Sequence, residues 1–171
     1  MTPDDDRGAE RGPQGGLLGR ALAAVLLMPG TVAFLVPWLL RPDGAAVRSS
    51  GLLVLGLGTA MLLWCVRDFY VAGRGSLAPW SPPERLVVVG LYRYSRNPMY
   101  VAVLSIVAGW ALAFDAAALW VYAGTLGLAF HLRVVHGEEP WLARTHGDRW
   151  VAYQAAVPRW LPLRFRQAPL P

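Results

Sequence analysis

The sequence predicts an all-α integral membrane protein with about four transmembrane helices, a C-terminal helical hairpin and a cytoplasmic amphipathic helix. The composition is 55% hydrophobic and only 16% charged, whereas a soluble domain usually carries about 25% charged residues. Long apolar runs recur along the chain, at or near the ~20 residues that a transmembrane helix needs. Arginine, proline and glycine cluster between these runs, as expected of loops and membrane ends.

Length and charge narrow the possible classes of protein. The 171 residues suffice for one domain, which we place at residues 17–171 behind a polar, disordered tail at residues 1–16. All 16 basic residues are arginine and the net charge is +5, but the arginines sit mainly at membrane ends, so a nucleic-acid partner is not indicated. Cys65 is single and lies in an apolar run, so we expect a small core residue and no intrachain disulfide. The three histidines are scattered, so no metal site is predicted.

The first apolar run covers residues 17–40 and is interrupted at Pro29 and Pro37. A signal peptide is the alternative, but its apolar core is usually only about 7–15 residues long. We therefore expect a transmembrane helix, kinked at Pro29.

The second span covers residues 51–72, where Gly56 and Gly58 should allow close contact with another helix. Arg67 and Asp68 lie near its end. Ionisable residues in such a place are either anchored at the interface or functional. Arg67 therefore either reaches the membrane surface or faces an internal polar cavity.

The next stretch connects the second and third spans. Residues 73–89 are rich in proline and glycine, which predicts a stiff ledge that ends in an extended segment at residues 86–89. Gly90 to Tyr100 then form an arginine and tyrosine cluster. Arg93 and Arg96 are three residues apart, so one helical turn would put both guanidinium groups on one side.

A helical hairpin follows, with spans at residues 98–114 and 116–135. Pro98 suits the first turn of a helix, and Asp115 is the expected N-cap of the second arm. A third helix should restart at residues 137–140, where Pro140 fits the first helical position and two glutamates favour the positive helix end.

The C-terminal segment, residues 137–171, contains a short amphipathic helix at residues 148–156. Trp150 and Tyr153 on it are expected to be membrane anchors. The arginine excess flanking the second to fourth spans places both termini and the loop after the second span in the cytoplasm, as expected for a bacterial inner-membrane protein.

This topology brings residues 92–100 close to residues 133–139. Together they supply guanidinium groups, carboxylates, phenols and an amide at a membrane surface. Such a set suits S-adenosylmethionine, because arginine binds carboxylates, acidic groups bind amines and ribose hydroxyls, and aromatic faces hold a sulfonium cation. It also suits a dinucleotide, although no glycine-rich dinucleotide motif follows a strand. No serine nucleophile elbow occurs either.

The motifs together resemble the isoprenylcysteine carboxyl methyltransferase and phospholipid methyltransferase group of membrane enzymes. The resemblance rests on Gly-Leu-Tyr-Arg-Tyr-Ser-Arg-Asn-Pro-Met-Tyr at residues 90–100, on Glu138-Glu139 and on the segment from Leu142 to Arg159, and it covers about the C-terminal two thirds. It implies S-adenosylmethionine as cofactor and a lipophilic acceptor that enters between helices. The implied cofactor-binding residues are Gly90, Leu91, Tyr92, Tyr94, Arg96, Asn97, Pro98, Tyr100, His136, Glu138 and Glu139.

The implied reaction needs few catalytic groups. Glu138 and Glu139 are candidate bases for an amine acceptor, and Arg67 is the further catalytic candidate. Asn97 stands where the eukaryotic pattern has histidine, so a proton-transfer role at that position is not expected.

Several alternatives stay open at this point. The acceptor is an isoprenylcysteine-like carboxylate, a lipid amine or another small amphiphile, and membrane lipid is a partner. Tyr92, Tyr94 and Tyr100 also fit an interfacial aromatic belt, and the glutamates fit a solvated helix start. The alternative functions are an NADPH-dependent membrane reductase of the sterol reductase type and a non-catalytic carrier or assembly subunit. The sequence does not indicate the oligomeric state.

Overall fold

The structure is a computed structural model that describes residues 26–73 and 86–161. The predicted tail, the first part of the first span, most of the proline-rich ledge and the last ten residues lie outside the described residues. Within those two ranges every regular element is helical. They are a π-helical segment Leu26–Leu35, α2 Val36–Leu40, α3 Ser49–Gly73, a 3₁₀ turn Gly90–Arg93, α4 Pro98–Phe114, α5 Ala117–Arg133, a π-helical turn Val134–Glu138, α6 Glu139–His146 and α7 Asp148–Ala156.

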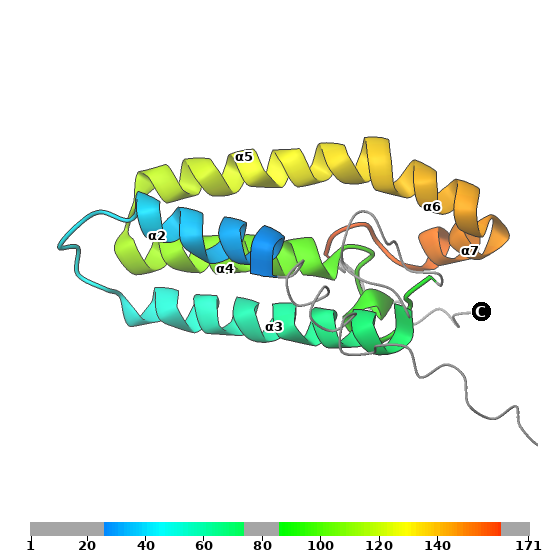
Figure 1. Cartoon of the computed structure of the whole chain (residues 1–171), viewed down its shortest axis with the longest axis horizontal. Coiled ribbons are helices and arrows are strands. Elements are labelled where there is room, and N and C mark those ends of the chain that lie inside the picture. Colours follow the sequence, from blue (N-terminus) through cyan, green and yellow to red (C-terminus); the bar gives the residue numbers. More distant parts are fainter. Residues whose placement is uncertain (1–25, 74–85, 162–171) are drawn as a thin grey trace, which may run out of the picture.

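Helix α4 lies at the centre of the bundle. It runs between α3 and α5, and the helical segment ending in α2 packs on it as well (Figure 1). The main core cluster joins these elements through small and branched side chains: Ala33, Leu62, Ala102, Val103 and Ile106. The loop between α2 and α3 lies at one end of the bundle, and α6 and α7 lie at the other (Figure 1).

Small residues let α3 and α4 pack backbone to backbone. A Cβ atom at Gly109 of α4 would overlap the backbone of Leu55, and one at Gly58 of α3 would lie 2.9 Å from the backbone nitrogen of Ile106. Such close approach is how helices associate without a hydrophobic driving force. The expectation of close contact is confirmed for Gly58 but wrong for Gly56, which is exposed and where an added Cβ atom would meet nothing within 4 Å.

The turn between α4 and α5 differs from the prediction. Asp115 adopts the left-handed conformation (φ 50°) and ends α4, with its backbone N–H donating to the Ala111 carbonyl. The N-cap of α5 is Ala116, without a side-chain cap, so the N-cap assigned to Asp115 was wrong. The Asp115 carboxylate instead accepts a 2.6 Å bond from Arg48, because the α2–α3 loop ends beside this turn.

The predicted helix restart at residues 137–140 was also wrong. The helix continues without a break from Ala117 to His146. Just before Pro140 its backbone hydrogen bonds change from the α-helical to the π-helical pattern. The Glu139 N–H donates to the Val134 carbonyl, five residues earlier. Proline cannot donate to the preceding turn, and a π-helical turn absorbs such an irregularity inside a continuous helix.

Helix α7 has the predicted bounds and folds back beneath α6 (Figure 1). Trp150 and Tyr153 are buried, packing with Val157 against Leu86 and Val88. The prediction that they anchor the chain in the membrane was wrong, because the apolar face of this helix is covered by the protein.

Two described segments, Ser49–Asp68 and Ala117–His146, are long and apolar enough to cross a membrane; Pro29–Leu40 and Pro98–Phe114 are shorter apolar helices. Large apolar side chains cover the outer surfaces of α3 and α5, among them Leu53, Leu57, Leu63, Trp64, Trp120, Val121 and Leu128. Exposed apolar surface on long apolar helices is typical of a membrane protein. The assignment of four spans and their orientation remain predictions.

Candidate functional site

The loop before α4 begins with a turn that requires glycine. Gly90 has φ 57°, a conformation that side chains disfavour, and a Cβ atom there would collide with the Asp68 carboxylate. Tyr92 on this turn is 7% exposed and packs with Cys65 and Val87. Its carbonyl accepts a 2.7 Å hydrogen bond from the Tyr153 hydroxyl, so α7 holds the loop in place.

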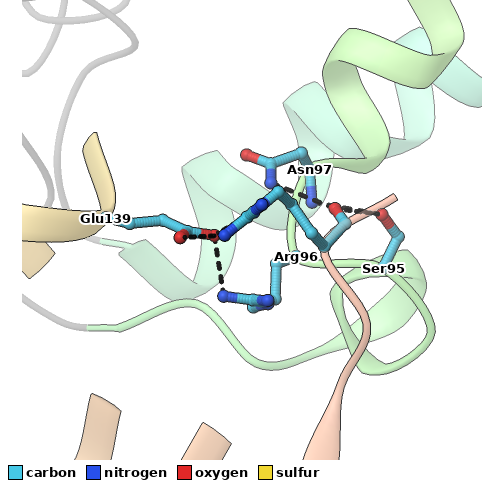
Figure 2. Close-up of polar contacts among 5 residues, drawn as sticks. Ser95, Arg96, Asn97 and Glu139 are labelled. Atoms are coloured by element: carbon cyan, nitrogen blue, oxygen red, sulfur yellow. Dashed lines mark hydrogen bonds and ion pairs between the residues drawn. The ribbon is translucent and has the colours of Figure 1, made fainter. Parts of the chain in front are cut away.

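Glu139 is the centre of a closed ionic cluster. Its Oε1 accepts from Arg96 at 2.7 Å and from Arg159 at 2.8 Å, and its Oε2 accepts a second 2.8 Å bond from Arg159. The Arg96 and Glu139 side chains are only 9% and 11% exposed. Figure 2 shows Arg96, Ser95 and Asn97 gathered on one side of Glu139. Burial lowers the pKa of Arg96 while Glu139 opposes that change, and hydrogen bonds to Glu139 raise the pKa of Arg159.

The backbone around Arg159 is tied to the same loop. The Arg96 N–H donates to the Pro158 carbonyl at 2.9 Å. The Arg159 carbonyl accepts from the Asn97 amide at 3.1 Å and from the Ser95 hydroxyl at 3.4 Å. The loop, the start of α6 and the segment after α7 therefore form one hydrogen-bonded unit.

Glu138 belongs to a second and more open cluster. The Tyr100 hydroxyl donates to Glu138, and Arg133 donates to Glu138 at 2.8 Å and to the Tyr100 oxygen at 3.1 Å. The Glu138 and Arg133 side chains are 34% and 51% exposed. The Tyr100 ring packs on Phe130 with centroids 4.4 Å apart. Adjacent glutamates thus have different environments, one closed and one accessible.

The structure brings together five of the residues expected at the site: Arg96, Asn97, Tyr100, Glu138 and Glu139. Leu91 belongs to the same loop and Pro98 is the first residue of α4, whereas the side chains of Tyr94 and His136 are exposed. Neither glutamate is a merely solvated helix start, since both are bonded within a continuous helix.

Two arginines do not lie where the sequence suggested. Arg93 is exposed and Arg96 is inside, because the 3₁₀ turn ends at Arg93 and the chain changes direction. The expectation that both guanidinium groups share one side was wrong. Arg67 is 73% exposed and pairs with Asp68 at 3.3 Å, so the internal-cavity interpretation of Arg67 is not supported.

The sequence placed Arg133 near the site within residues 133–139 but gave it no role, and it did not assign Arg159 or Asp68 to the site. One feature of the sequence pointed to such partners: arginines occur both before and after the two adjacent glutamates. A buried carboxylate needs a cation as partner, so some of these arginines were to be expected beside the glutamates. Arg159 follows Pro158 directly after a short amphipathic helix, a place from which a side chain can reach back to the loop.

Comparison with known protein families gives a match over the central part of the chain. A family model described as phospholipid methyltransferase matches residues 47–149, which is more than half of the chain. The match includes α3, α4, α5, α6 and the loop with Arg96 and Asn97. No curated protein and no solved structure matches the chain.

Proposed function

The chain belongs to the phospholipid methyltransferase family, and from this premise we propose that it transfers a methyl group from S-adenosylmethionine to a lipophilic acceptor at a membrane surface. As a member it is a methyltransferase, and methyltransferases of this family use S-adenosylmethionine. Membership therefore favours this activity over the reductase and carrier alternatives. The family also implies a phospholipid-type substrate.

The donor groups at the polar end of the helices fit this cofactor. S-adenosylmethionine supplies an electrophilic methyl group on a sulfonium, together with an amine, a carboxylate and ribose hydroxyls. The accessible Glu138 carboxylate suits the amine or the hydroxyls. Both oxygens of Glu139 are already bonded, so we propose that Glu139 contributes chiefly by holding Arg96 and the loop in place.

The remaining loop residues complete the proposed binding surface. Asn97 would offer its amide and Tyr100 its phenol, and the backbone of residues 90–94 would line the same place. Pro98 fixes the start of α4, and His136 lies exposed on the turn that carries Glu138.

The acceptor would enter from the bilayer between helices. Holding the acceptor atom in line with the methyl group supplies most of the rate enhancement in such a transfer. An isoprenylcysteine-like carboxylate reacts as it stands, whereas an amine must lose a proton, for which Glu138 is the proposed base. Arg67, exposed at the end of α3, is proposed to meet an anionic group of the acceptor.

One observation carries the proposal: Glu138 is bonded to Tyr100 and Arg133 yet remains one-third exposed, beside a loop fixed by the closed cluster around Glu139. This arrangement gives a rigid support next to an accessible carboxylate. Rigid support of a binding group is what positioning chemistry requires.

The test is calorimetric titration of the detergent-purified protein with S-adenosylhomocysteine and then with NADPH. We expect Glu138→Gln to weaken S-adenosylhomocysteine binding about 10- to 150-fold, the effect of losing a charge-assisted hydrogen bond of roughly 1.5–3 kcal/mol. Asp148→Asn, at an exposed carboxylate of α7, is the control and should bind normally. A wild-type protein that binds NADPH but not S-adenosylhomocysteine would refute the proposal.

A further inference from the structure

Asp68, near the end of α3, carries a buried oxygen without a partner among the described residues. Its side chain is 8% exposed, and its Oδ2 makes no hydrogen bond there. Its Oδ1 lies 3.3 Å from Arg67, whose own side chain is 73% exposed. An ion pair to an exposed arginine is weak, whereas an unpaired buried carboxylate oxygen is costly.

Two groups lie close to this oxygen. Gly90 lies directly against the Asp68 carboxylate, and the indole nitrogen of Trp64 is 3.3 Å from where a Cβ of Gly90 would be. Trp64 is 53% exposed, so its ring links the buried carboxylate to the outer surface of α3. A buried carboxylate oxygen without a partner is a site for a cationic donor such as an ammonium group, which it binds through a charge-assisted hydrogen bond.

The location connects this oxygen to the proposed site. Burial raises the pKa of Tyr92 well above its ordinary value, and Coulombic interactions with Cys65, Tyr153, Asp68 and Glu138 raise it further. Geometry gives the same connection, because Gly90, which lies against the Asp68 carboxylate, begins the loop that leads through Arg96 to α4.

The outer surface of α3 offers a path for a lipid. Leu53, Leu57 and Trp64 are exposed and recur at helical spacing, and Asp68 follows Trp64 by one turn. A lipid chain lying along this stripe would bring its headgroup to the level of Asp68.

We propose that Asp68 binds an ammonium group of a ligand, with Trp64 beside it. The inference rests on the proposed function for the identity of that ligand, which provides two sources: the headgroup of an amino lipid and the amino group of the cofactor. Either source leaves the carboxylate paired. The same negative charge would repel an acceptor whose reacting group is a carboxylate.

Two binding measurements on the full-length protein in detergent separate the sources. One titrates S-adenosylhomocysteine, and the other titrates lysophosphatidylethanolamine against lysophosphatidylglycerol, which lacks the amine. Asp68→Asn should weaken one of the two amine ligands at least about tenfold. Loss of S-adenosylhomocysteine binding assigns the cofactor amine, and loss of the preference for the ethanolamine lipid assigns the headgroup.

Asp115→Asn is the matched control. It makes the same change at an exposed carboxylate at the far end of α4, in a left-handed conformation that asparagine tolerates. Both ligands should bind it normally. A folded Asp68→Asn protein that binds both amine ligands like the wild type overturns the proposal.

A measurement on the wild type keeps the test independent of folding of the variant. The wild type should prefer lysophosphatidylethanolamine to lysophosphatidylglycerol, or S-adenosylhomocysteine to its analogue without the amino group. Absence of both preferences also overturns the proposal. If the wild type binds no S-adenosylhomocysteine but shows an ethanolamine preference that Asp68→Asn abolishes, the proposed function fails while the role of Asp68 stands.

Discussion

Glu139 accepts hydrogen bonds from two arginines that reach it from different parts of the chain, one before α4 and one after α7. Glu138, its neighbour, faces Tyr100 and Arg133 instead. Adjacent residues of a helix point about 100° apart, so the two side chains reach different partners. The two adjacent glutamates therefore differ in role: Glu139 ties parts of the chain together, and Glu138 provides an accessible carboxylate.

The first prediction concerns stability at this residue. Glu139→Gln removes the charge that Arg96 and Arg159 share, leaving a buried guanidinium uncompensated, so we expect a loss of about 3–5 kcal/mol in the free energy of unfolding. Glu138→Gln breaks pairs that are more exposed and should lose about 1 kcal/mol or less. Denaturant unfolding in detergent measures both, and equal losses would argue against the closed cluster.

The second prediction concerns Asn97. Its amide donates to the Arg159 carbonyl, and we expect Asn97→Ala to weaken S-adenosylhomocysteine binding and Asn97→His to retain much of it, since histidine also donates. Histidine titrates near pH 6.5. The His variant should therefore gain a transition in affinity between about pH 6 and 7.5 that the wild type lacks at this position.

The measurement for Asn97 is S-adenosylhomocysteine affinity against pH for the three proteins. Ser95→Ala is the comparison variant: it removes the 3.4 Å bond to the Arg159 carbonyl and the 3.1 Å bond that the Ser95 hydroxyl accepts from the Asn97 backbone N–H. It leaves the Asn97 side chain in place, so it should change affinity less than Asn97→Ala. If Asn97→Ala binds S-adenosylhomocysteine like the wild type, the Asn97 side chain does not contact the cofactor. Binding would then depend on the loop backbone and the glutamates.

Residue types and spacing were enough to gather part of the site. Arg96, Asn97, Tyr100 and the glutamates are close in space, as the motifs predicted. Which arginine pairs with which glutamate was not predictable, because Arg159 reaches Glu139 only as a result of the path that the chain takes after α7. Trp150 and Tyr153 were misplaced for a related reason: an amphipathic pattern shows which face is apolar but not whether lipid or protein covers it.

At the scale of elements, the long apolar runs located the helices well. The predicted bounds of α4 and α7 match the structure, and α3 differs by one or two residues. The errors fall at junctions, at Asp115 and at residues 137–140. Aspartate suits both an N-cap and a left-handed helix end, and proline suits both a helix start and a widened turn, so local sequence alone did not decide between them.

The third prediction concerns the contact between α3 and α4. Gly109→Ala would place a methyl group against the backbone of Leu55, so we expect a loss of about 1–3 kcal/mol from overpacking and a lower thermal midpoint in detergent. Gly124→Ala is the matched control: this α5 glycine has open space around it, and alanine favours helix. An unchanged midpoint for Gly109→Ala would mean that the two helices pack less closely than described.

At the scale of the whole molecule, the two ends of the bundle differ in character. One end carries the α2–α3 loop and the Arg48–Asp115 pair, and the other carries the loop at residues 90–97, both glutamates and α7 (Figure 1). The arginine distribution predicted that these groups share a face, and the described helices bring them to one end. Which compartment each end faces is a prediction, with the glutamate end proposed to be cytoplasmic.

The fourth prediction tests this orientation. Asp43 and Arg93 are exposed at opposite ends, and Cys65 is fully buried, so single Asp43→Cys and Arg93→Cys variants provide labelling sites with little background. A membrane-impermeant maleimide should label Asp43→Cys in intact bacterial cells and Arg93→Cys only after lysis. The opposite pattern would invert the topology.

The bond between Glu139 and Arg159 also sets an order of events during biosynthesis. The apolar helices among the described residues all precede Arg159 in the chain, so Arg159 is the last of the three cluster members to be synthesised. Until then Glu139 has Arg96 as its only partner in this cluster, and the Pro158 and Arg159 carbonyls that hold the loop do not yet exist. A chain that stops after α6 would therefore lack the contacts from Pro158 and Arg159 that hold the loop at residues 90–97.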